Sequence, residues 1–213
     1  MKIGILGSGI VAQTLGAGFL DHGYQVMMGT REPAKLADWH KQNSKATIGD
    51  FAATAGFAEV AVLAVKGTAA KAALEHTGSE LKGKIVIDAT NPISDAPPVN
   101  GVLRFSTTLD ESLMEALQHE YKDVRFVKAF NSVGSALMVN PSFHGGKPTM
   151  FICGNDEVAK KTVTKILDQF GWEIADMGKA EAARAIEPLC MLWCIPGLLR
   201  NDWNHAFKLL SAA

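Results

Sequence analysis

The sequence has few of the residues that would connect it to a disulfide scaffold, to nucleic acid or to a membrane. It holds 3 cysteines in 213 residues. This number is odd and too small for a disulfide framework. Its formal net charge is −1, and no basic patch predicts nucleic-acid binding. No run reaches the ~18 uninterrupted apolar residues of a membrane span. These absences predict a cytoplasmic protein that binds neither nucleic acid nor membrane.

The sequence also lacks the residue sets typical of hydrolases and metalloenzymes. Its 6 histidines are scattered along the chain, and most are expected on the surface. Cys190 and Cys194 lie four apart in an expected helix, where a place in the core is favoured because a zinc site needs more ligands nearby. His144, beside two glycines, is left open as a substrate contact. We therefore expect no metal site.

What the sequence does have is a glycine turn at its start. The apolar run Lys2–Leu6 predicts a buried strand, and Gly7-Ser8-Gly9 leads from it into a helix. With Ala12, this stretch reads G-x-G-x-x-A, the dinucleotide-binding pattern. The first glycine allows the tight turn, and the second lets the backbone approach a pyrophosphate. The first amides of the helix, beginning at Ile10 and Val11, would then face phosphate groups.

The end of the second strand lacks an acidic residue. The apolar run Tyr24–Met28 is followed by Gly29-Thr30-Arg31, with Lys35 one helical turn further on. NAD-binding folds place an Asp or Glu here to bind the ribose 2′-hydroxyl, whereas a hydroxyl, a guanidinium and an ammonium would bind a 2′-phosphate. The sequence therefore predicts NADP(H). The alternative is that Arg31 and Lys35 are solvated charges at the start of a helix.

Buried strands and helices alternate along most of the chain. Further strands are expected at Thr47–Ile48, Val60–Val65, Lys84–Asp88, Val124–Phe130, Lys147–Cys153 and Trp172–Asp176, the last near the sheet edge. This alternation predicts an α/β fold with a Rossmann-type, doubly wound, mostly parallel sheet over residues 1–178. Ligands bind beyond the carboxyl ends of such strands, which selects the loops Gly7–Val11, Gly29–Lys35, Val65–Thr68 and Thr90–Ser94.

Residues 179–213 differ in character and are expected to form a short helical segment. Its apolar helical composition is interrupted at Pro188 and at Pro196-Gly197. So apolar a segment should cover the sheet and pack against a second subunit, which predicts a homodimer. Arg184 and Glu187 are expected to pair on a solvated face or in the dimer contact.

Four segments carry a resemblance to a known family: KIGILGSG at Lys2–Gly9, MGTR at Met28–Arg31, IVIDATNP at Ile85–Pro92 and FVKAFN at Phe126–Asn131. In these segments the sequence resembles the NADPH-dependent F420 reductases, the F420-dependent NADP oxidoreductase family. The resemblance implies a small NADP-binding Rossmann domain with a short helical tail, usually dimeric. It also implies hydride transfer between NADPH and the deazaflavin F420, or flavins in related reductases.

The resemblance also implies roles for particular residues. Ser8, Gly9, Ile10 and Val11 would follow the pyrophosphate, Thr30, Arg31 and Lys35 would bind the 2′-phosphate, Val65 and Lys66 would line the cleft, and Asn91-Pro92 and Asn131-Ser132 would flank the nicotinamide. An amide at a strand end can orient the nicotinamide carboxamide or a carbonyl of the acceptor. Asn91, Asn131 and Ser132 are therefore the catalytic candidates, although Asn91 could equally serve the turn before Pro92.

The predicted function is an NADP-dependent oxidoreductase that passes hydride between NADP(H) and a flavin-like or deazaflavin acceptor. Hydride transfer between two flat rings needs stacking and exclusion of water more than an acid or base. One alternative is an imine or keto reductase resembling pyrroline-5-carboxylate reductase, although that family carries a longer helical dimerisation domain. The other is a non-catalytic module that senses NADP(H).

Overall fold

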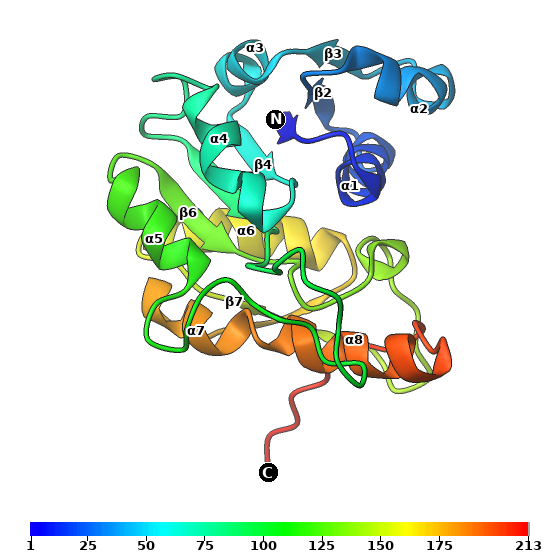
Figure 1. Ribbon diagram of the computed structural model, residues 1–213. Coiled ribbons are helices and arrows are strands. Elements are labelled where there is room, and N and C mark those ends of the chain that lie inside the picture. Colours follow the sequence, from blue (N-terminus) through cyan, green and yellow to red (C-terminus); the bar gives the residue numbers. More distant parts are fainter. Residues whose placement is uncertain (213) are drawn as a thin grey trace.

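A six-stranded parallel sheet forms the centre of the computed structural model, which describes residues 1–212 (Figure 1). Its strands are β1 (Lys2–Leu6), β2 (Gln25–Gly29), β3 (Thr47–Gly49), β4 (Val60–Leu63), β5 (Ile85–Asp88) and β6 (Arg125–Lys128), in the order β3-β2-β1-β4-β5-β6. The predicted Rossmann-type sheet is therefore confirmed. The strand order reverses between β1 and β4, the point where a doubly wound sheet opens a ligand crevice at its carboxyl ends.

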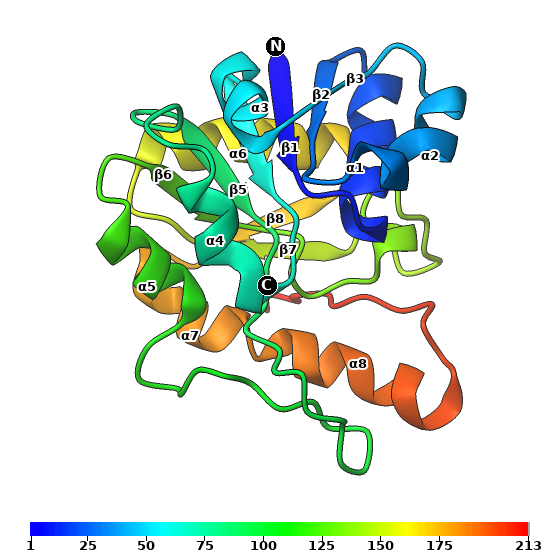
Figure 2. The same ribbon diagram turned by 45° about the horizontal axis from the view of Figure 1, so that its top comes forward.

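Helices cover both faces of this sheet (Figure 2). In chain order the helices are α1 (Ile10–Asp21), α2 (Ala37–Gln42), α3 (Phe51–Phe57), α4 (Ala70–Glu75), α5 (Leu113–Glu120), α6 (Glu157–Gln169), α7 (Ala183–Ile186) and α8 (Leu189–Arg200), the last of which runs below the sheet. Because helices lie on both faces, β4 and β5 are buried along their whole length. One core cluster packs α1 and α6 against the sheet, and the other packs α3, α4 and α5.

Side-chain caps fix where several helices begin. Asp50 accepts a hydrogen bond from the Ala53 amide at 2.7 Å, and Asp156 caps α6 through the Ala159 amide at the same distance. α5 begins at Leu113, because Ser112 and Glu115 form a reciprocal capping box there.

The last two strands do not extend the main sheet as predicted. β7 (Thr149–Ile152) and β8 (Glu173–Asp176) form a separate two-stranded parallel sheet. It meets the main sheet at one antiparallel bridge, where the Lys128 amide donates to the Cys153 carbonyl at 2.9 Å. A side chain at Gly154 would lie 2.5 Å from the Phe126 carbonyl oxygen, so the two backbones approach closely only because this residue is glycine.

The prolines of the tail do not break its helices as predicted. Helical structure continues from Ala180 to Arg200. Pro188 precedes the first turn of α8, where a missing amide costs little, and Pro196 lies inside the helix. The helix ends at Asn201, which adopts a left-handed φ of 55°. The predicted domain boundary at 178/179 falls between β8 and this helical stretch.

After Arg200 the chain returns to the domain without helical structure. The Thr149 amide donates to the Phe207 carbonyl at 2.9 Å, so this returning segment lies along β7. Ala180–Arg200 has a mean hydropathy of 1.3 in its most apolar window, of which 33% is buried, and by length and composition alone it could cross a membrane.

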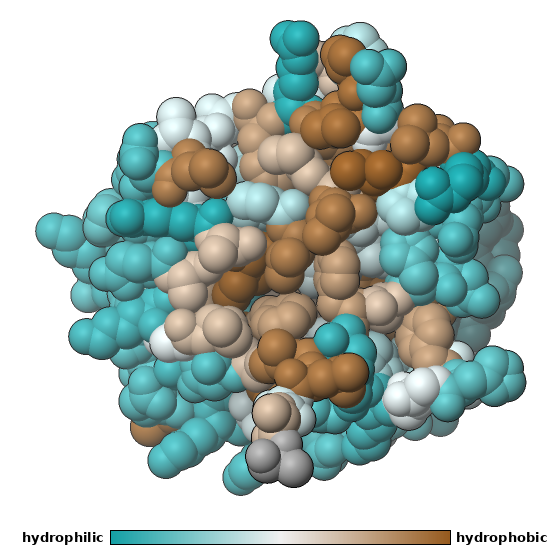
Figure 3. Space-filling view, turned by 90° about the horizontal axis from the view of Figure 1, so that it is seen from below, coloured by the Kyte–Doolittle hydropathy of each residue, from teal (hydrophilic) through white to brown (hydrophobic). Residues whose placement is uncertain are grey.

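The outer face of α8 is apolar. Seen from below, apolar residues form a band across the molecule (Figure 3). Exposed apolar side chains of α8 and of the neighbouring loop are Leu192, Leu198, Leu199, Val99 and Val102.

Candidate functional site

The turn after β1 has the geometry that its glycines predict. Gly7 adopts a φ of +143°, and a side chain there would lie 2.3 Å from the Ala64 carbonyl oxygen. Only glycine is tolerated at such a position. Around Gly9, in contrast, no atom lies within 4 Å of where a Cβ would stand. The first glycine is therefore needed for the fold, whereas the second leaves space beside the backbone.

The start of α1 presents free amides to this space. Gly9 is the residue before the helix, and no side chain within residues 1–212 caps it. The first hydrogen bond of the helix runs from the Gln13 amide to the Gly9 carbonyl at 3.0 Å. The amides of Ile10, Val11 and Ala12 therefore have no partner inside the helix and suit a pyrophosphate.

A cleft of about 410 Å³ lies in front of these amides. It is lined by Gly7, Ser8, Gly9, Thr30, Arg31, Glu32, Lys35, Phe51, Ala64, Val65, Lys66 and Ala69. We call it the adenosine half of the site. It brings the glycine turn together with the end of β2, as the sequence predicted.

The cationic end of this half contains an acidic residue that the sequence reading missed. Glu32 pairs with Lys35 at 2.7 Å, and both side chains are more than half exposed. Lys35 lowers the pKa of Glu32 through a hydrogen bond and its charge. Within residues 1–212, Arg31 forms no such ion pair. Thr30 is buried, and its hydroxyl accepts a hydrogen bond from the Glu32 amide at 3.1 Å. Arg31 is thus the cation best placed to meet a phosphate.

A second cleft of about 440 Å³ continues from the first. It is lined by Val11, Val65, Lys66, Gly67, Ala89, Thr90, Asn91, Ile93, Ser94 and Asp95. Val65 and Lys66 line both clefts, so one continuous groove follows the carboxyl ends of the central strands. We call this second part the nicotinamide half. The fit to a dinucleotide rests on this groove together with the space at Gly9 and the free amides of α1.

The two asparagines predicted at the reaction site lie one behind the other. Asn91 lines the cleft, and its side-chain amide donates to the Asn131 carbonyl at 2.8 Å. The Asn131 side chain donates in turn to Asn91 Oδ1 at 3.2 Å and to the Ile186 carbonyl at 2.9 Å. Asn131 is only 3% exposed. It therefore holds Asn91 against the helical tail rather than facing the cleft.

Other predicted residues lie outside the cleft lining. Ser132 and Pro92 are buried, and the Pro92 carbonyl accepts a hydrogen bond from the Ser106 amide at 2.7 Å. His144 is exposed in the turn before β7 and lines neither half of the groove.

A buried charge cluster lies directly behind the nicotinamide half. Lys128 Nζ is 2.7 Å from Asp88 Oδ2 and 2.8 Å from Glu187 Oε1, and the three side chains are almost completely buried. The same ammonium donates to the Thr90 carbonyl at 3.0 Å. Burial opposes the charge of Lys128, but Asp88 and Glu187 outweigh it and raise its pKa.

The position of Glu187 is a correction to the sequence reading, which expected a solvated residue paired with Arg184. Its carboxylate accepts hydrogen bonds from the amides of Leu113 and Met114, both at 3.0 Å, at the start of α5. Asp88 and Lys128 were not singled out either. The sequence does indicate them, because each is a charged residue at the end of an apolar strand, and the two strands are neighbours. A buried charge at such a place is stabilised only when it pairs with an opposite charge.

Arg184 pairs with Glu115 instead of Glu187. Its Nε lies 3.0 Å from both carboxylate oxygens of Glu115. Burial opposes ionisation of Glu115, but Arg184 and Ser112 outweigh it and lower its pKa to about 2. The tail is therefore joined to α5 by the Arg184–Glu115 ion pair and by the hydrogen bonds that Glu187 accepts.

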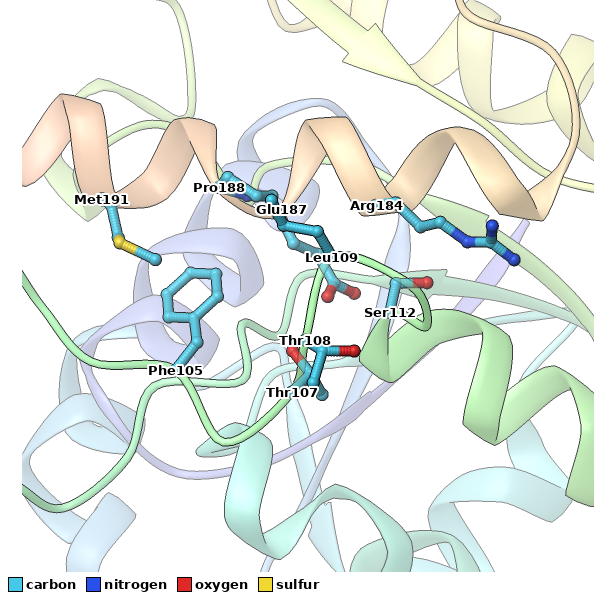
Figure 4. Close-up of a pocket in the computed structure, with 9 residues that line it drawn as sticks. All are labelled: Phe105, Thr107, Thr108, Leu109, Ser112, Arg184, Glu187, Pro188 and Met191. Atoms are coloured by element: carbon cyan, nitrogen blue, oxygen red, sulfur yellow. The ribbon is translucent and has the colours of Figure 1, made fainter.

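A separate cavity of about 310 Å³ lies on the outer side of these contacts. It is lined by Phe105, Thr107, Thr108, Leu109, Ser112, Arg184, Glu187, Pro188 and Met191. Figure 4 shows Phe105 and Met191 on one side, with Ser112 and Arg184 toward the other. Glu187 thus lines this cavity and also belongs to the buried charge cluster.

The sequence and the fold of this chain match those of known proteins. The family model "NADP oxidoreductase coenzyme F420-dependent" matches residues 2–92. The solved structure of a candidate F420-dependent NADP reductase from Arthrobacter sp. FB24 is 31% identical, covers 99% of this chain and 100% of its own, and has a TM-score of 0.93. The chain belongs to the F420-dependent NADP oxidoreductase family. It is an NADP-dependent oxidoreductase with a Rossmann-like fold, as its sequence predicted.

Two curated relatives are longer than this chain. Metalloreductase STEAP3 of Rattus norvegicus is 30% identical over 219 residues, which cover 93% of this chain and 39% of that protein. The F420-dependent NADP reductase of Methanocaldococcus jannaschii is 30% identical over 138 residues, or 63% of this chain and 60% of that protein. The chain therefore spans less than two thirds of either relative, and the names of the two relatives point to different acceptors.

Proposed function

We propose that this family member transfers hydride between NADP(H) and a flavin-like or deazaflavin acceptor such as F420. The observation that carries the proposal is the lining of the nicotinamide half. Its only titratable side chains are Lys66 and Asp95, which lie 3.8 Å apart and are both strongly exposed. A site without a buried acid or base at its opening suits ring-to-ring hydride transfer better than protonation of an imine or a ketone.

The cofactor, when bound, supplies the hydride, and the chain supplies its orientation. The amides of Ile10 and Val11, with Ser8 and Gly9, would hold the pyrophosphate. Thr30 and Arg31 would hold the 2′-phosphate, assisted by Lys35, which Glu32 partly neutralises. Val65 and Lys66, which line both halves of the groove, would then lie beside the part of the cofactor that joins the adenosine to the nicotinamide.

Around the nicotinamide, Asn91 is the residue in position to bind the carboxamide. Asn131 acts through Asn91, because both hydrogen bonds between the two residues fix the Asn91 side chain. Ser132 follows it in the same buried turn. Val11 and Ile93 add apolar surface on which a flat acceptor can stack.

NADPH oxidation with a panel of acceptors tests this proposal. The protein is incubated with NADPH and F420, FMN, FAD or a cyclic imine, and the loss of NADPH absorbance is followed. Turnover with F420 or a flavin is the expected result. Turnover with the imine alone would establish the imine reductase alternative. Tight NADPH binding without turnover on any acceptor would favour an NADP(H)-sensing module.

We also propose a cytoplasmic homodimer in which the apolar face of α8 contacts the second subunit. The exposed Leu192, Leu198 and Leu199 support this contact, since such a face is favourably covered by another surface. Light scattering after size exclusion should give a dimer mass, and Leu199→Asp should shift it to the monomer. Cell fractionation tests the location.

A further inference from the structure

The buried charge cluster lies one layer beneath the nicotinamide half of the groove. Asp88 is the last residue of β5, and the three residues that follow it, Ala89, Thr90 and Asn91, line the groove. Lys128 Nζ binds the Thr90 carbonyl from below at 3.0 Å. Any charge carried by the cluster therefore acts on a ring bound in the nicotinamide half.

The cluster does not balance its charges. Two carboxylates, from Asp88 and Glu187, face one ammonium, from Lys128, with side-chain exposures of 0%, 2% and 0%. The start of α5, which donates two amides to Glu187, contributes about half a positive charge. An excess of negative charge remains, and burial keeps solvent from screening it.

The other charged groups near this half do not cancel that excess. Arg184 and Glu115 pair with each other, and so do Lys66 and Asp95 at the rim. Burial raises the pKa of the Cys153 thiol to about 12, so this cysteine, on which the charges of the cluster act, is neutral.

The groove is therefore polarised along its length. In the adenosine half, Arg31 and Lys35 outnumber Glu32 and give a positive end that suits phosphate. The nicotinamide half has the buried negative excess. A nicotinamide ring is uncharged when reduced and positively charged when oxidised, so the two redox states differ in how they interact with that excess.

We propose that Asp88 and Glu187 are specificity-determining residues that favour the oxidised ring, so that the site acts as a hydride donor. Loss of hydride from bound NADPH leaves a positive charge on the ring, and the flavin-like acceptor gains the hydride with its two electrons. The buried carboxylates stabilise that new charge without touching the ring. This inference rests on the proposed function, because it requires NADP(H) in the groove.

Separate measurements of NADP+ and NADPH affinity by calorimetry test the inference. Asp88→Asn and Glu187→Gln each remove one charge and leave a neutral pair with Lys128. Each should weaken the binding of NADP+ relative to that of NADPH by about 4- to 30-fold. This range is the effect of removing one unit charge that lies roughly 8–20 Å from the charged ring, at an effective dielectric constant of about 20. Binding of 2′,5′-ADP, which lacks the ring, should not change.

Glu115→Gln is the matched control, because it also removes a buried carboxylate, but one that Arg184 neutralises outside the cluster. Its ratio of affinities should equal that of the wild type. The wild type itself should bind NADP+ at least as tightly as NADPH, a result that needs no variant to fold. An unchanged ratio in folded Asp88→Asn or Glu187→Gln, or an equal shift in Glu115→Gln, would overturn the inference. A wild type that binds neither nucleotide would overturn the proposed function and this inference with it.

Discussion

Lys128 Nζ and Glu187 Oε1 lie 2.8 Å apart, and this ion pair joins the end of β6 to the helical tail. Glu187 also binds the start of α5, and Lys128 also binds the Thr90 carbonyl. The nicotinamide half is therefore supported by the tail, although no residue of α7 or α8 lines it.

Lys128→Met should lower the free energy of unfolding by about 3–5 kcal/mol, because two buried carboxylates lose their common partner. Urea unfolding followed by circular dichroism measures the loss. Lys160→Met is the control. Lys160 is also nearly buried between two carboxylates, but the Asp176 and Glu157 side chains are 44% and 70% exposed. Its loss should stay below about 1 kcal/mol. An equal loss of unfolding free energy in the two variants would contradict the claim that Lys128 stabilises two buried carboxylates.

Gly7→Ala and Gly9→Ala should separate folding from cofactor binding. At Gly7 a methyl group would lie 2.3 Å from the Ala64 carbonyl oxygen, and the backbone is strained for any other residue. We expect a stability loss of at least about 1–3 kcal/mol. At Gly9 the methyl meets no protein atom within 4 Å. The melting temperature should therefore hardly change, while NADPH binding weakens because the methyl occupies the space of the pyrophosphate. Undiminished NADPH binding by Gly9→Ala would place the pyrophosphate elsewhere.

Arg31→Glu should weaken NADPH binding by about 1.5–3 kcal/mol, the range for a hydrogen bond to a charged group. NADH lacks the 2′-phosphate, so its binding should change much less, and thermal shift with both nucleotides gives the comparison. Glu32→Gln should act in the opposite direction. It releases Lys35, which Glu32 holds at 2.7 Å, and should tighten NADPH binding, most visibly at low salt. A loss of NADPH and NADH binding to the same extent would show that Arg31 does not select the phosphate.

The Glu115–Arg184 pair should make stability depend on acidic pH. In the folded protein Arg184 and Ser112 outweigh burial and lower the pKa of Glu115 from its ordinary value of 4.5 to about 2. Its contribution is therefore fully present above about pH 4.5 and is lost as the pH falls toward 2, because the unfolded chain takes up the proton first. Glu115→Gln should reduce the difference in stability between pH 6 and pH 3. An identical pH profile in the variant would contradict this role of Glu115.

The N-terminal half of the fold was predictable because its signals are local. The glycine turn and the apolar strands depend on residues close together in sequence. Apolar runs give the position of strands but not their partners. Consequently β7 and β8 were recognised as strands but assigned to the wrong sheet.

The missed parts of the site depend on contacts between distant segments. Glu187 looked like a surface residue because helical composition alone does not show which face meets the Lys128 ammonium. Asn131 was placed at a strand end, but its orientation toward Asn91 and the tail could not be derived from spacing. Pro188 and Pro196 were read as helix breaks, whereas tertiary packing keeps the tail helical around them.

The place of Glu187 near the end of the chain has a consequence for assembly during translation. The chain leaves the ribosome from its N-terminus, so β1 to β4 and the glycine turn become available first. Asp88 and Lys128 emerge next and can pair with each other, but Glu187, the third member of their cluster, follows only at the end of α7. In a nascent chain the adenosine half of the groove should therefore form well before the charge cluster that supports the nicotinamide half is complete.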